Sequence, residues 1–273
     1  MGFYFENSKI YVMAILNVTP DSFFSKSRCF DNETLITKAR IFADEGADIF
    51  DIGAVSTRPG ANPVNEKEEL KRLIPAIELL QENFPDIPIS IDTYRANVAK
   101  ECCKRFDISI INDVTGGQDP AMFDIVAQTG VSYVLSHLQG PLEEMQQHTY
   151  YNNLIEDIKN FFAQKIKQLH EKGVSSIILD PGFGFSKTLQ QNYSLLHQLH
   201  SLKEFHLPIM VGISRKSMIY KPLNITPDEA LNGTSVLHAL ALEQGADILR
   251  VHDVREARQV ITLHNIYNQC SQV

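Results

Sequence analysis

Eight short apolar runs, each followed by a stretch with helical periodicity, are the feature that most constrains how this chain can fold. The apolar runs occupy residues 10–16, 48–53, 87–92, 108–113, 131–136, 175–180, 207–212 and 246–251. Amphipathic stretches such as 34–47 and 154–173 lie between them. Near-continuous apolar runs are typical of strands buried on both faces, and alternating strand and helix patterns indicate a parallel sheet.

The number of these units predicts how the sheet closes. Eight strand–helix units in 273 residues favour a (β/α)8 TIM barrel, a fold that typically takes roughly 250 residues. An open, doubly wound sheet is the alternative. The sequence shows no linker, low-complexity segment or close repeat, so we predict one α/β domain spanning residues 1–273.

Charge and cysteine content limit the possible partners and the compartment. A net charge of -8 and a pI of about 5.6 argue against a general nucleic-acid or membrane-surface binder. The start of the chain lacks a basic leader, and no apolar stretch approaches the length of a membrane span. The cysteines show no metal-ligand spacing, so we expect reduced thiols in a cytoplasmic protein: Cys29, Cys102, Cys103 and Cys270.

Polar residues stand at the end of nearly every apolar run. In a barrel, catalytic groups gather where strands end and the following loops begin. Asp92, Asn112 and Asp180 end three of the runs. Their carboxylate and amide oxygens can accept from adjacent N–H donors. These residues therefore predict a ligand with a donor-rich heterocyclic ring.

Cationic residues at other strand ends predict an anion at the second end of the ligand. The donors suited to phosphate or carboxylate are Arg58, Arg215, Lys216, Arg250 and His252. Ser217 is expected to open a helix whose backbone N–H groups favour an anion. The alternative for Arg58 and Arg215 is a structural ion pair, and a lone His137 is more typical of a satisfied structural group. Without a His/Cys cluster, any metal is expected to be Mg²⁺ bound mainly through substrate phosphates.

The segment ILDPGFGFSKT raises a separate possibility, a phosphate-binding loop. That motif needs a glycine directly before the lysine, but Ser186 stands before Lys187. We therefore favour Asp180 as the functional acid and Phe185 as an apolar wall for a flat ring. Lys187 is then expected to be an ordinary surface or helix-start residue.

Seven strand-end segments together resemble one known family. ILNVTPDSF, STRPGA, SIDT, INDV, LDPGFGF, VGISRKS and RVHDV occur in this order between residues 15 and 254. They are similar to the dihydropteroate synthases of the pterin-binding barrel family. The resemblance implies a transferase of folate biosynthesis that joins p-aminobenzoate to 6-hydroxymethyl-7,8-dihydropterin diphosphate. It also implies Mg²⁺, a homodimer and competition by sulfonamides.

The resemblance assigns roles to residues at the matching positions. The implied pterin ligands are Asp92, Asn112, Val114, Leu138, Asp180, Phe185, Gly212, Lys216 and Arg250. Asn17, Arg250 and His252 are implied to contact the diphosphate, with Asn17 also contacting Mg²⁺. The implied p-aminobenzoate site comprises Phe23, Thr57, Arg58, Pro59, Lys216 and Ser217. The implied catalytic residues are Asn17, Asp92, Lys216, Arg250 and His252.

Four segments depart from the family pattern, although none removes a residue assigned above. The first loop is SFFSKSRCF where SFSDGG is usual, and GAVSTRPG replaces GGESTRPG. SHLQG replaces MHMQG, and GFGFSK replaces GFGFGK. Losing both glycines of the first loop is expected to stiffen or re-route that loop. A non-catalytic pterin-binding paralogue and a methyltetrahydrofolate-dependent methyltransferase remain as alternative functions.

Overall fold

The structure, a computed structural model, describes residues 2–6, 9–19, 32–55 and 64–270. Within these ranges one strand lies in each of the eight predicted apolar runs. The strands are β1 Tyr11–Asn17, β2 Ile49–Gly53, β3 Ile89–Asp92, β4 Ile110–Asp113, β5 Ser132–Ser136, β6 Ile177–Asp180, β7 Met210–Val211 and β8 Ile248–Val251. Seven of the eight are shorter than the run that predicted them, and β7 has only 2 residues.

All strand pairs in the sheet are parallel, in the order β6-β5-β4-β3-β2-β1-β8-β7. The two outer strands in this order are joined by an isolated bridge between Leu179 and Ile209. The Leu179 N–H also donates to the Pro208 carbonyl at 2.8 Å. The sheet therefore closes on itself, and the predicted (β/α)8 barrel is confirmed over the open alternative.

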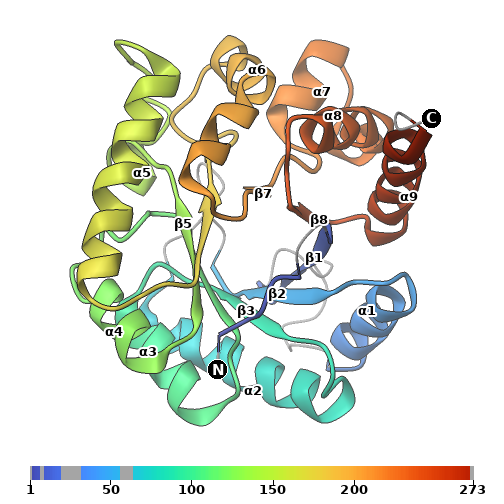
Figure 1. Cartoon of the computed structure of the whole chain (residues 1–273). Coiled ribbons are helices and arrows are strands. Elements are labelled where there is room, and N and C mark those ends of the chain that lie inside the picture. Colours follow the sequence, from blue (N-terminus) through green and yellow to red (C-terminus); the bar gives the residue numbers. More distant parts are fainter. Residues whose placement is uncertain (1, 7–8, 20–31, 56–63, 271–273) are drawn as a thin grey trace.

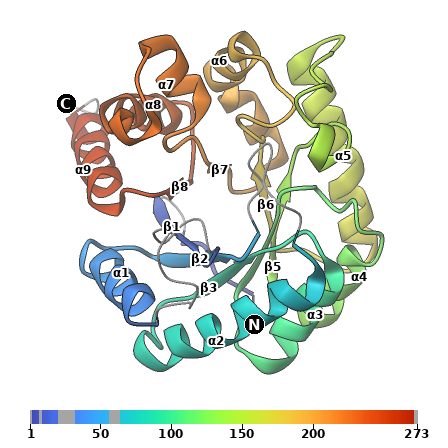
Figure 2. The ribbon, with the colours of Figure 1, turned by 180° about the vertical axis from the view of Figure 1, so that it is seen from behind.

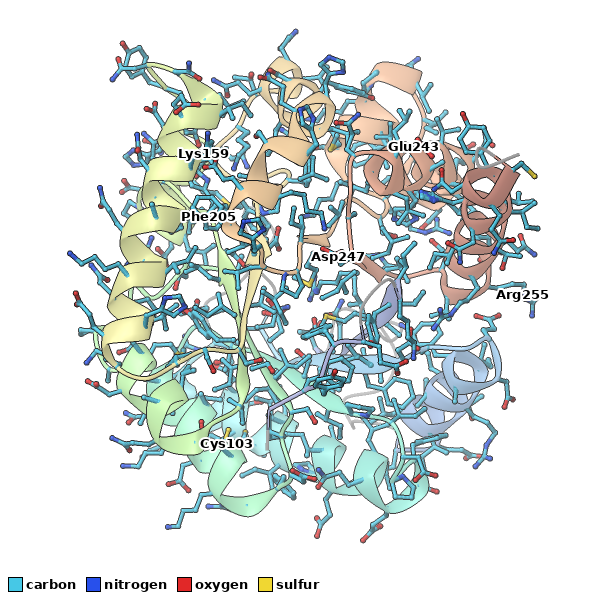
Figure 3. All side chains as sticks on the ribbon, in the orientation of Figure 1. Cys103, Lys159, Phe205, Glu243, Asp247 and Arg255 are labelled. Atoms are coloured by element: carbon cyan, nitrogen blue, oxygen red, sulfur yellow. The ribbon has the colours of Figure 1, made fainter. Side chains whose placement is uncertain are left out.

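Helices surround the strands on all sides (Figures 1 and 2). They are α1 Asn32–Asp44, α2 Glu66–Asn83, α3 Ala96–Arg105, α4 Met122–Thr129, α5 Leu154–Glu171, α6 Leu189–His197, α7 Ser217–Leu223, α8 Leu231–Glu243 and α9 Val254–Cys270. Short 3-10 turns occupy Leu142–Glu144, Leu199–Phe205 and Pro227–Glu229. Charged side chains such as Lys159, Glu243 and Arg255 lie on the outer helices (Figure 3).

Buried apolar side chains form two separate cores. The larger one packs the outer face of the strands against the helices. The smaller one fills the barrel interior with Tyr11, Met13, Ile49, Ile110, Val134, Ile178, Met210 and Ile248. Phe3 and Phe5 pack against this inner core, and their rings meet edge to face at 4.7 Å between centroids.

The inward-facing positions become polar toward the carboxyl ends of the strands. Side chains alternate between the two faces of a strand, so Asp51 shares the inner face of β2 with Ile49. Asp51 lies level with Ser90 of β3. By the same alternation Arg250 shares the inner face of β8 with Ile248 and lies nearer the carboxyl end of the strand. The barrel interior is therefore apolar in its lower part and polar at the carboxyl ends of the strands.

Candidate active site

The predicted site residues that the structure describes meet at the carboxyl end of the barrel. Asn17, Asp92 and Asp180 are the last residues of β1, β3 and β6. Asn112 and Arg250 lie one residue before the ends of β4 and β8. Ser217 is the first residue of α7, and the others lie in the segments that follow strands: Val114, Leu138, Phe185, Gly212, Lys216 and His252. Phe23, Thr57, Arg58 and Pro59 lie outside the described residues.

A network of charged groups centres on Arg250. Its Nε donates to Asp51 Oδ2 and its Nη2 to Asp92 Oδ2, each at 2.6 Å. Asn112 Nδ2 donates to Asp51 Oδ2 at 3.1 Å, and Ser90 Oγ donates to Asp51 Oδ1 at 2.6 Å. Arginine has five N–H donors. Arg250 is therefore oriented by two carboxylates and keeps donors for a ligand.

Asp51 was missed as a functional residue by the sequence interpretation. It lies inside an apolar run, between Phe50 and Ile52, and its side chain is fully buried. A carboxylate inside such a run costs free energy unless a donor or cation satisfies it. Asp51 also lies two residues after Ile49, so both side chains face the barrel interior. A buried carboxylate at an inward-facing position was therefore the sequence signal that could have identified Asp51.

The pKa values of this network are shifted by burial. Burial raises the pKa of Asp92 to about 7, although the adjacent Arg250 cation opposes the shift. Burial acts to lower the pKa of Arg250, but the Asp51 and Asp92 carboxylates outweigh it and raise that pKa. Arg250 therefore stays charged, while Asp92 titrates near neutral pH and can accept or donate a hydrogen bond.

Asp180 lies at the start of a tight turn after β6. Its Oδ1 accepts from the Gly182 N–H at 2.8 Å. Gly182 adopts a φ of 71°, and a Cβ there would lie 2.1 Å from the carbonyl oxygen of His137. Only glycine fits this close approach. The turn therefore packs directly on the segment after β5, and Oδ2 of Asp180 accepts from none of the described residues.

Lys216 lies between this turn and Arg250. Its Nζ donates to the Phe183 carbonyl at 2.6 Å and lies 4.6 Å from the centroid of the Phe185 ring. A Cβ at Gly212 would lie 3.9 Å from Arg250 and 4.0 Å from Lys216 Nζ, so Gly212 leaves space between the two cations. Burial lowers the pKa of Lys216 to about 8, with the Asp180 carboxylate opposing the shift.

Lys187 lies just before the start of α6, as predicted, but it is not a surface residue. Its side chain is buried, and Nζ contacts His137 Nδ1 at 3.0 Å and the carbonyls of Gly182 and Phe185 at 3.1 Å each. Local sequence shows only that it precedes the Thr188 cap of α6. Its burial depends on packing against His137, which is 50 residues away.

The phosphate-loop interpretation also lacks support from α6. Thr188 and Gln191 form a capping box: the Gln191 N–H donates to Thr188 Oγ1, and the Thr188 N–H donates to Gln191 Oε1. These side chains satisfy backbone donors that a phosphate loop presents to its ligand. Lys187 Nζ is bonded to the turn rather than directed at an anion.

Ser186 adopts a left-handed backbone conformation, with a φ of 51°. Serine stands here in GFGFSK, at the position where the resemblance implies the glycine of GFGFGK. Its Oγ donates to the Gln139 carbonyl at 2.7 Å and accepts from the Gln139 N–H at 3.2 Å. The hydroxyl thus stabilises a conformation that serine otherwise disfavours.

We expect Ser186→Ala to lower the free energy of unfolding by about 1–2 kcal/mol, because it removes both hydrogen bonds and keeps the strained backbone. Ser186→Gly removes the same bonds but relieves the strain, so it should be less destabilising than alanine. Urea unfolding of both variants measures this. An alanine variant as stable as the wild type would contradict the role of the hydroxyl.

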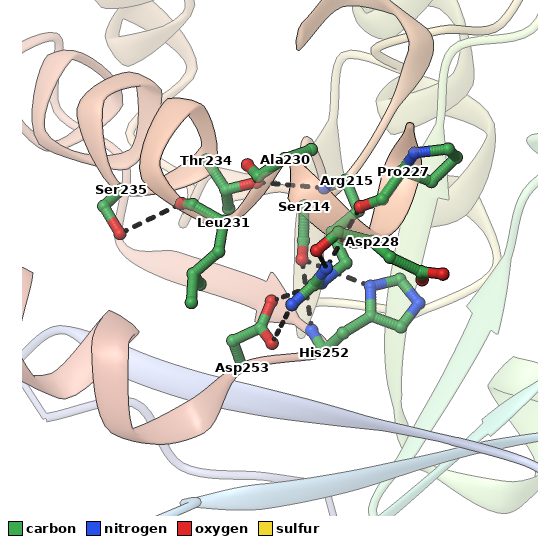
Figure 4. Close-up of polar contacts among 10 residues, drawn as sticks. All are labelled: Ser214, Arg215, Pro227, Asp228, Ala230, Leu231, Thr234, Ser235, His252 and Asp253. Carbon is green, nitrogen blue, oxygen red and sulfur yellow. Dashed lines mark hydrogen bonds and ion pairs between the residues drawn. The ribbon is translucent and has the colours of Figure 1, made fainter. Parts of the chain in front are cut away.

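A second cluster holds the segment after β7 against the end of β8 (Figure 4). Arg215 pairs with Asp253 through Nε and Nη2, both at 2.8 Å, and also donates to the carbonyls of Pro227 and Asp228. Arg215 therefore acts as structural support, the alternative left open by the sequence. Ser214 Oγ lies 3.2 Å from both the backbone N and Nδ1 of His252, which orients that ring.

Asn17 fits a role as an oxygen ligand for magnesium. A Cβ at Gly53 would lie 3.5 Å from both Asn17 Oδ1 and Asp92 Oδ2, so these oxygens border the same small space. Within the described ranges no group of three or more His, Cys, Asp or Glu could hold a metal. Mg²⁺ commonly uses one or two protein oxygens together with substrate phosphates and water. The donor set matches that mode.

The fold and the polar side chains at the carboxyl ends of its strands define an α/β barrel of the enzyme type, with one candidate ligand site. Residues 13–252 match the family described as "Pterin binding enzyme". The dihydropteroate synthase of Escherichia coli K12 is 40% identical over 248 residues, covering 90% of this chain and 87% of the relative. The chain therefore belongs to the dihydropteroate synthase family.

Solved structures give the same result. Yersinia pestis dihydropteroate synthase, in a sulfonamide drug complex, has a TM-score of 0.92 and 39% identity, covering 98% of both chains. The enzyme from Clostridium difficile, in the presence of pteroic acid, has a TM-score of 0.90 and 39% identity, covering 97% of this chain and 99% of that one.

No described helix has both the length and the apolar character needed to cross a membrane.

Proposed function

We propose that the chain condenses p-aminobenzoate with 6-hydroxymethyl-7,8-dihydropterin diphosphate to give 7,8-dihydropteroate and diphosphate, a step of folate biosynthesis. The observation that carries this proposal is the convergence of Asp180, Asn112 and the Arg250–Asp92 pair at one barrel mouth beside Lys216. Acceptors for a donor-rich ring thus lie beside cations for an anionic group.

The pterin end of the proposed site is the acceptor-lined part of the mouth. The 2-amino and ring N–H groups of a pterin need acceptors, which Asp180 and Asn112 supply. Asp92, with its pKa raised to about 7, can hold either a donor or an acceptor of the ring. Val114, Leu138, Phe185 and Gly212 are proposed to line the flat faces.

Departure of diphosphate requires positive charge near the leaving oxygen. Arg250 is held in place by Asp51 and Asp92, and His252 is oriented by Ser214. We assign both to the diphosphate, with Asn17 as the protein ligand of Mg²⁺. The bound metal would neutralise charge on the phosphate oxygens.

The bond exchange uses the arylamine of p-aminobenzoate as the nucleophile. The bond between the pterin methylene carbon and the diphosphate oxygen breaks, a carbon–nitrogen bond forms, and the amine loses a proton. No nucleophilic side chain is required, so the protein acts by positioning and electrostatics. Lys216 and Ser217, with Phe23, Thr57, Arg58 and Pro59, are proposed to bind p-aminobenzoate.

Binding and turnover separate this proposal from a non-catalytic pterin-binding paralogue. Calorimetric titration with the pterin diphosphate measures binding, and release of diphosphate on adding p-aminobenzoate measures turnover. Both are expected. Binding without release favours the paralogue. A methyltransferase needs the pterin site but not the SRKS and STRPGA segments, which are both present here.

Sulfonamides are expected to inhibit competitively against p-aminobenzoate, because they present the same arylamine to the same site. The Yersinia pestis relative is described in complex with such a drug. Initial rates at several p-aminobenzoate concentrations test this: the apparent KM should rise with inhibitor while kcat stays constant. A fall in kcat at unchanged KM would place the drug elsewhere.

We also propose a cytoplasmic homodimer. Exposed apolar side chains on the neighbouring helices α8 and α9 support self-association: Val236, Leu240, Leu263, Ile266 and Tyr267. Clustered apolar exposure of this kind marks interaction surfaces. Sedimentation equilibrium tests the dimer.

The free thiols of Cys102, Cys103 and Cys270 fit a reducing compartment, which supports the proposed cytoplasmic location.

A further inference from the structure

Lys187 is a buried cation that the proposed chemistry does not use. Its side chain is 4% exposed. A lysine ammonium has three N–H donors and no acceptor. Three acceptors surround it, the carbonyls of Gly182 and Phe185 at 3.1 Å and His137 Nδ1 at 3.0 Å. A buried charge is costly unless it is paired, and Asp180 supplies an opposite charge.

Lys187 and Lys216 together bind three carbonyls of the turn after β6. Lys187 holds the carbonyls of Gly182 and Phe185, while Lys216 donates to the Phe183 carbonyl between them at 2.6 Å. Asp180 holds the N–H of Gly182, the residue whose carbonyl Lys187 holds. The shape of the turn, and with it the placement of Phe185 and Asp180, thus depends on Lys187.

His137 connects this turn to the end of β5. Burial lowers the pKa of His137 well below its ordinary value, and the nearby Lys187 charge lowers it further. The imidazole is therefore neutral, and its Nδ1 can accept from the Lys187 ammonium. That contact requires the tautomer with the proton on Nε2. Lys187 thus joins the segment after β5 to the turn after β6.

We propose that Lys187 is a positioning residue for pterin binding: it fixes the turn at 182–186 so that Asp180 and Phe185 have the geometry to hold the ring. This proposal rests on the proposed function. Lys187 does not itself touch the substrate, because its three donors are already engaged by the protein. Its loss should therefore affect the pterin more than p-aminobenzoate.

Lys187→Met tests this, because methionine keeps an unbranched stem and removes the donors. Lys165→Met is the matched control. Lys165 is a half-buried lysine of α5 whose Nζ donates to the Gly117 carbonyl at 3.4 Å, in the segment after β4. Binding of the pterin diphosphate is measured by calorimetry at pH 6, where Lys187 is charged, and circular dichroism records the folded fraction.

We expect Lys187→Met to weaken pterin binding by at least tenfold per folded molecule, with the KM for p-aminobenzoate changed by less than threefold. Lys165→Met should change neither. Equal affinity per folded molecule in Lys187→Met and wild type would overturn the proposal. If wild type itself fails to bind the pterin diphosphate, the proposed function is wrong instead, so the two failures are distinguishable.

A measurement on the wild type keeps the proposal testable if Lys187→Met does not fold. Nitrogen-15 spectra of histidine-labelled protein, with His137→Gln to assign the signal, report which ring nitrogen carries the proton. An unprotonated Nδ1 is expected at pH 6, below the pKa of Lys187, which burial lowers to about 7. A protonated Nδ1 would exclude the contact with the charged lysine and overturn the assignment.

Discussion

Replacing Arg250 with methionine should lower the free energy of unfolding by about 3–5 kcal/mol, because removing one partner leaves buried charge uncompensated. The Asp51 carboxylate is fully buried and would lose the guanidinium at 2.6 Å. Ser90 and Asn112 donate to Asp51 but carry no charge. The Asp92 carboxylate loses its 2.6 Å contact as well.

The decrease in the free energy of unfolding of Arg250→Met should depend on pH. The folded-state pKa of Asp92, already raised to about 7 in the wild type, rises further without the arginine. A carboxyl whose folded pKa lies above its unfolded value binds more protons when folded, so stability falls as pH rises between the two values. The variant should therefore be closest to wild type near pH 5 and furthest from it near pH 8.

Urea unfolding at these two pH values measures the effect. Arg255→Met is the matched control, since Arg255 lies on the outer face of α9 and pairs with Glu45 at 3.2 Å (Figure 3). An exposed pair of this kind contributes about 0–1 kcal/mol. Arg250→Met as stable as Arg255→Met would show that the buried network does not stabilise the fold.

Lys216→Met should lower kcat/KM for both substrates by about 100-fold or more, equivalent to about 2.7 kcal/mol of transition-state stabilisation. Lys216 contacts the turn that carries Phe185 and precedes Ser217, so it lies between the proposed pterin and p-aminobenzoate positions. Methionine removes the cation and leaves the Phe183 carbonyl without its donor. Unchanged constants for p-aminobenzoate would contradict the shared role.

The pH profile gives a second test of Lys216. Burial lowers its pKa to about 8, so the charged form is lost as pH rises through that value. Wild-type kcat/KM should therefore fall above about pH 8. Lys216→Arg keeps its charge to higher pH and should lose this alkaline limb, although at lower activity because the guanidinium has a different shape. Lys221→Met, on the exposed side of the same helix, serves as the control.

The barrel could be predicted because its signal is local and repeated. Each apolar run and amphipathic stretch shows its own period, and eight units in one domain-sized chain favour closure. The strand-end residues Asp92, Asn112 and Asp180 could be found for the same reason. Parallel strands carry their carboxyl ends to one side, so residues distant in sequence meet there.

The pairing of these residues could not be predicted, because it depends on tertiary structure. Asp51 and Arg250 are 199 residues apart, and nothing in either local sequence specifies the contact. Lys187 precedes a helix cap, a position that is usually exposed, and only packing against His137 buries it. Ser186 occupies a left-handed position because its hydroxyl bonds to Gln139, which glycine-based turn rules do not anticipate.

The most direct test of the central claim is a product assay with the purified chain, both substrates and Mg²⁺. Mass spectrometry follows 7,8-dihydropteroate, and a coupled assay follows diphosphate. We expect one diphosphate per dihydropteroate, with no product when either substrate is omitted. Tight binding of the pterin diphosphate without any dihydropteroate would contradict the assignment as a synthase.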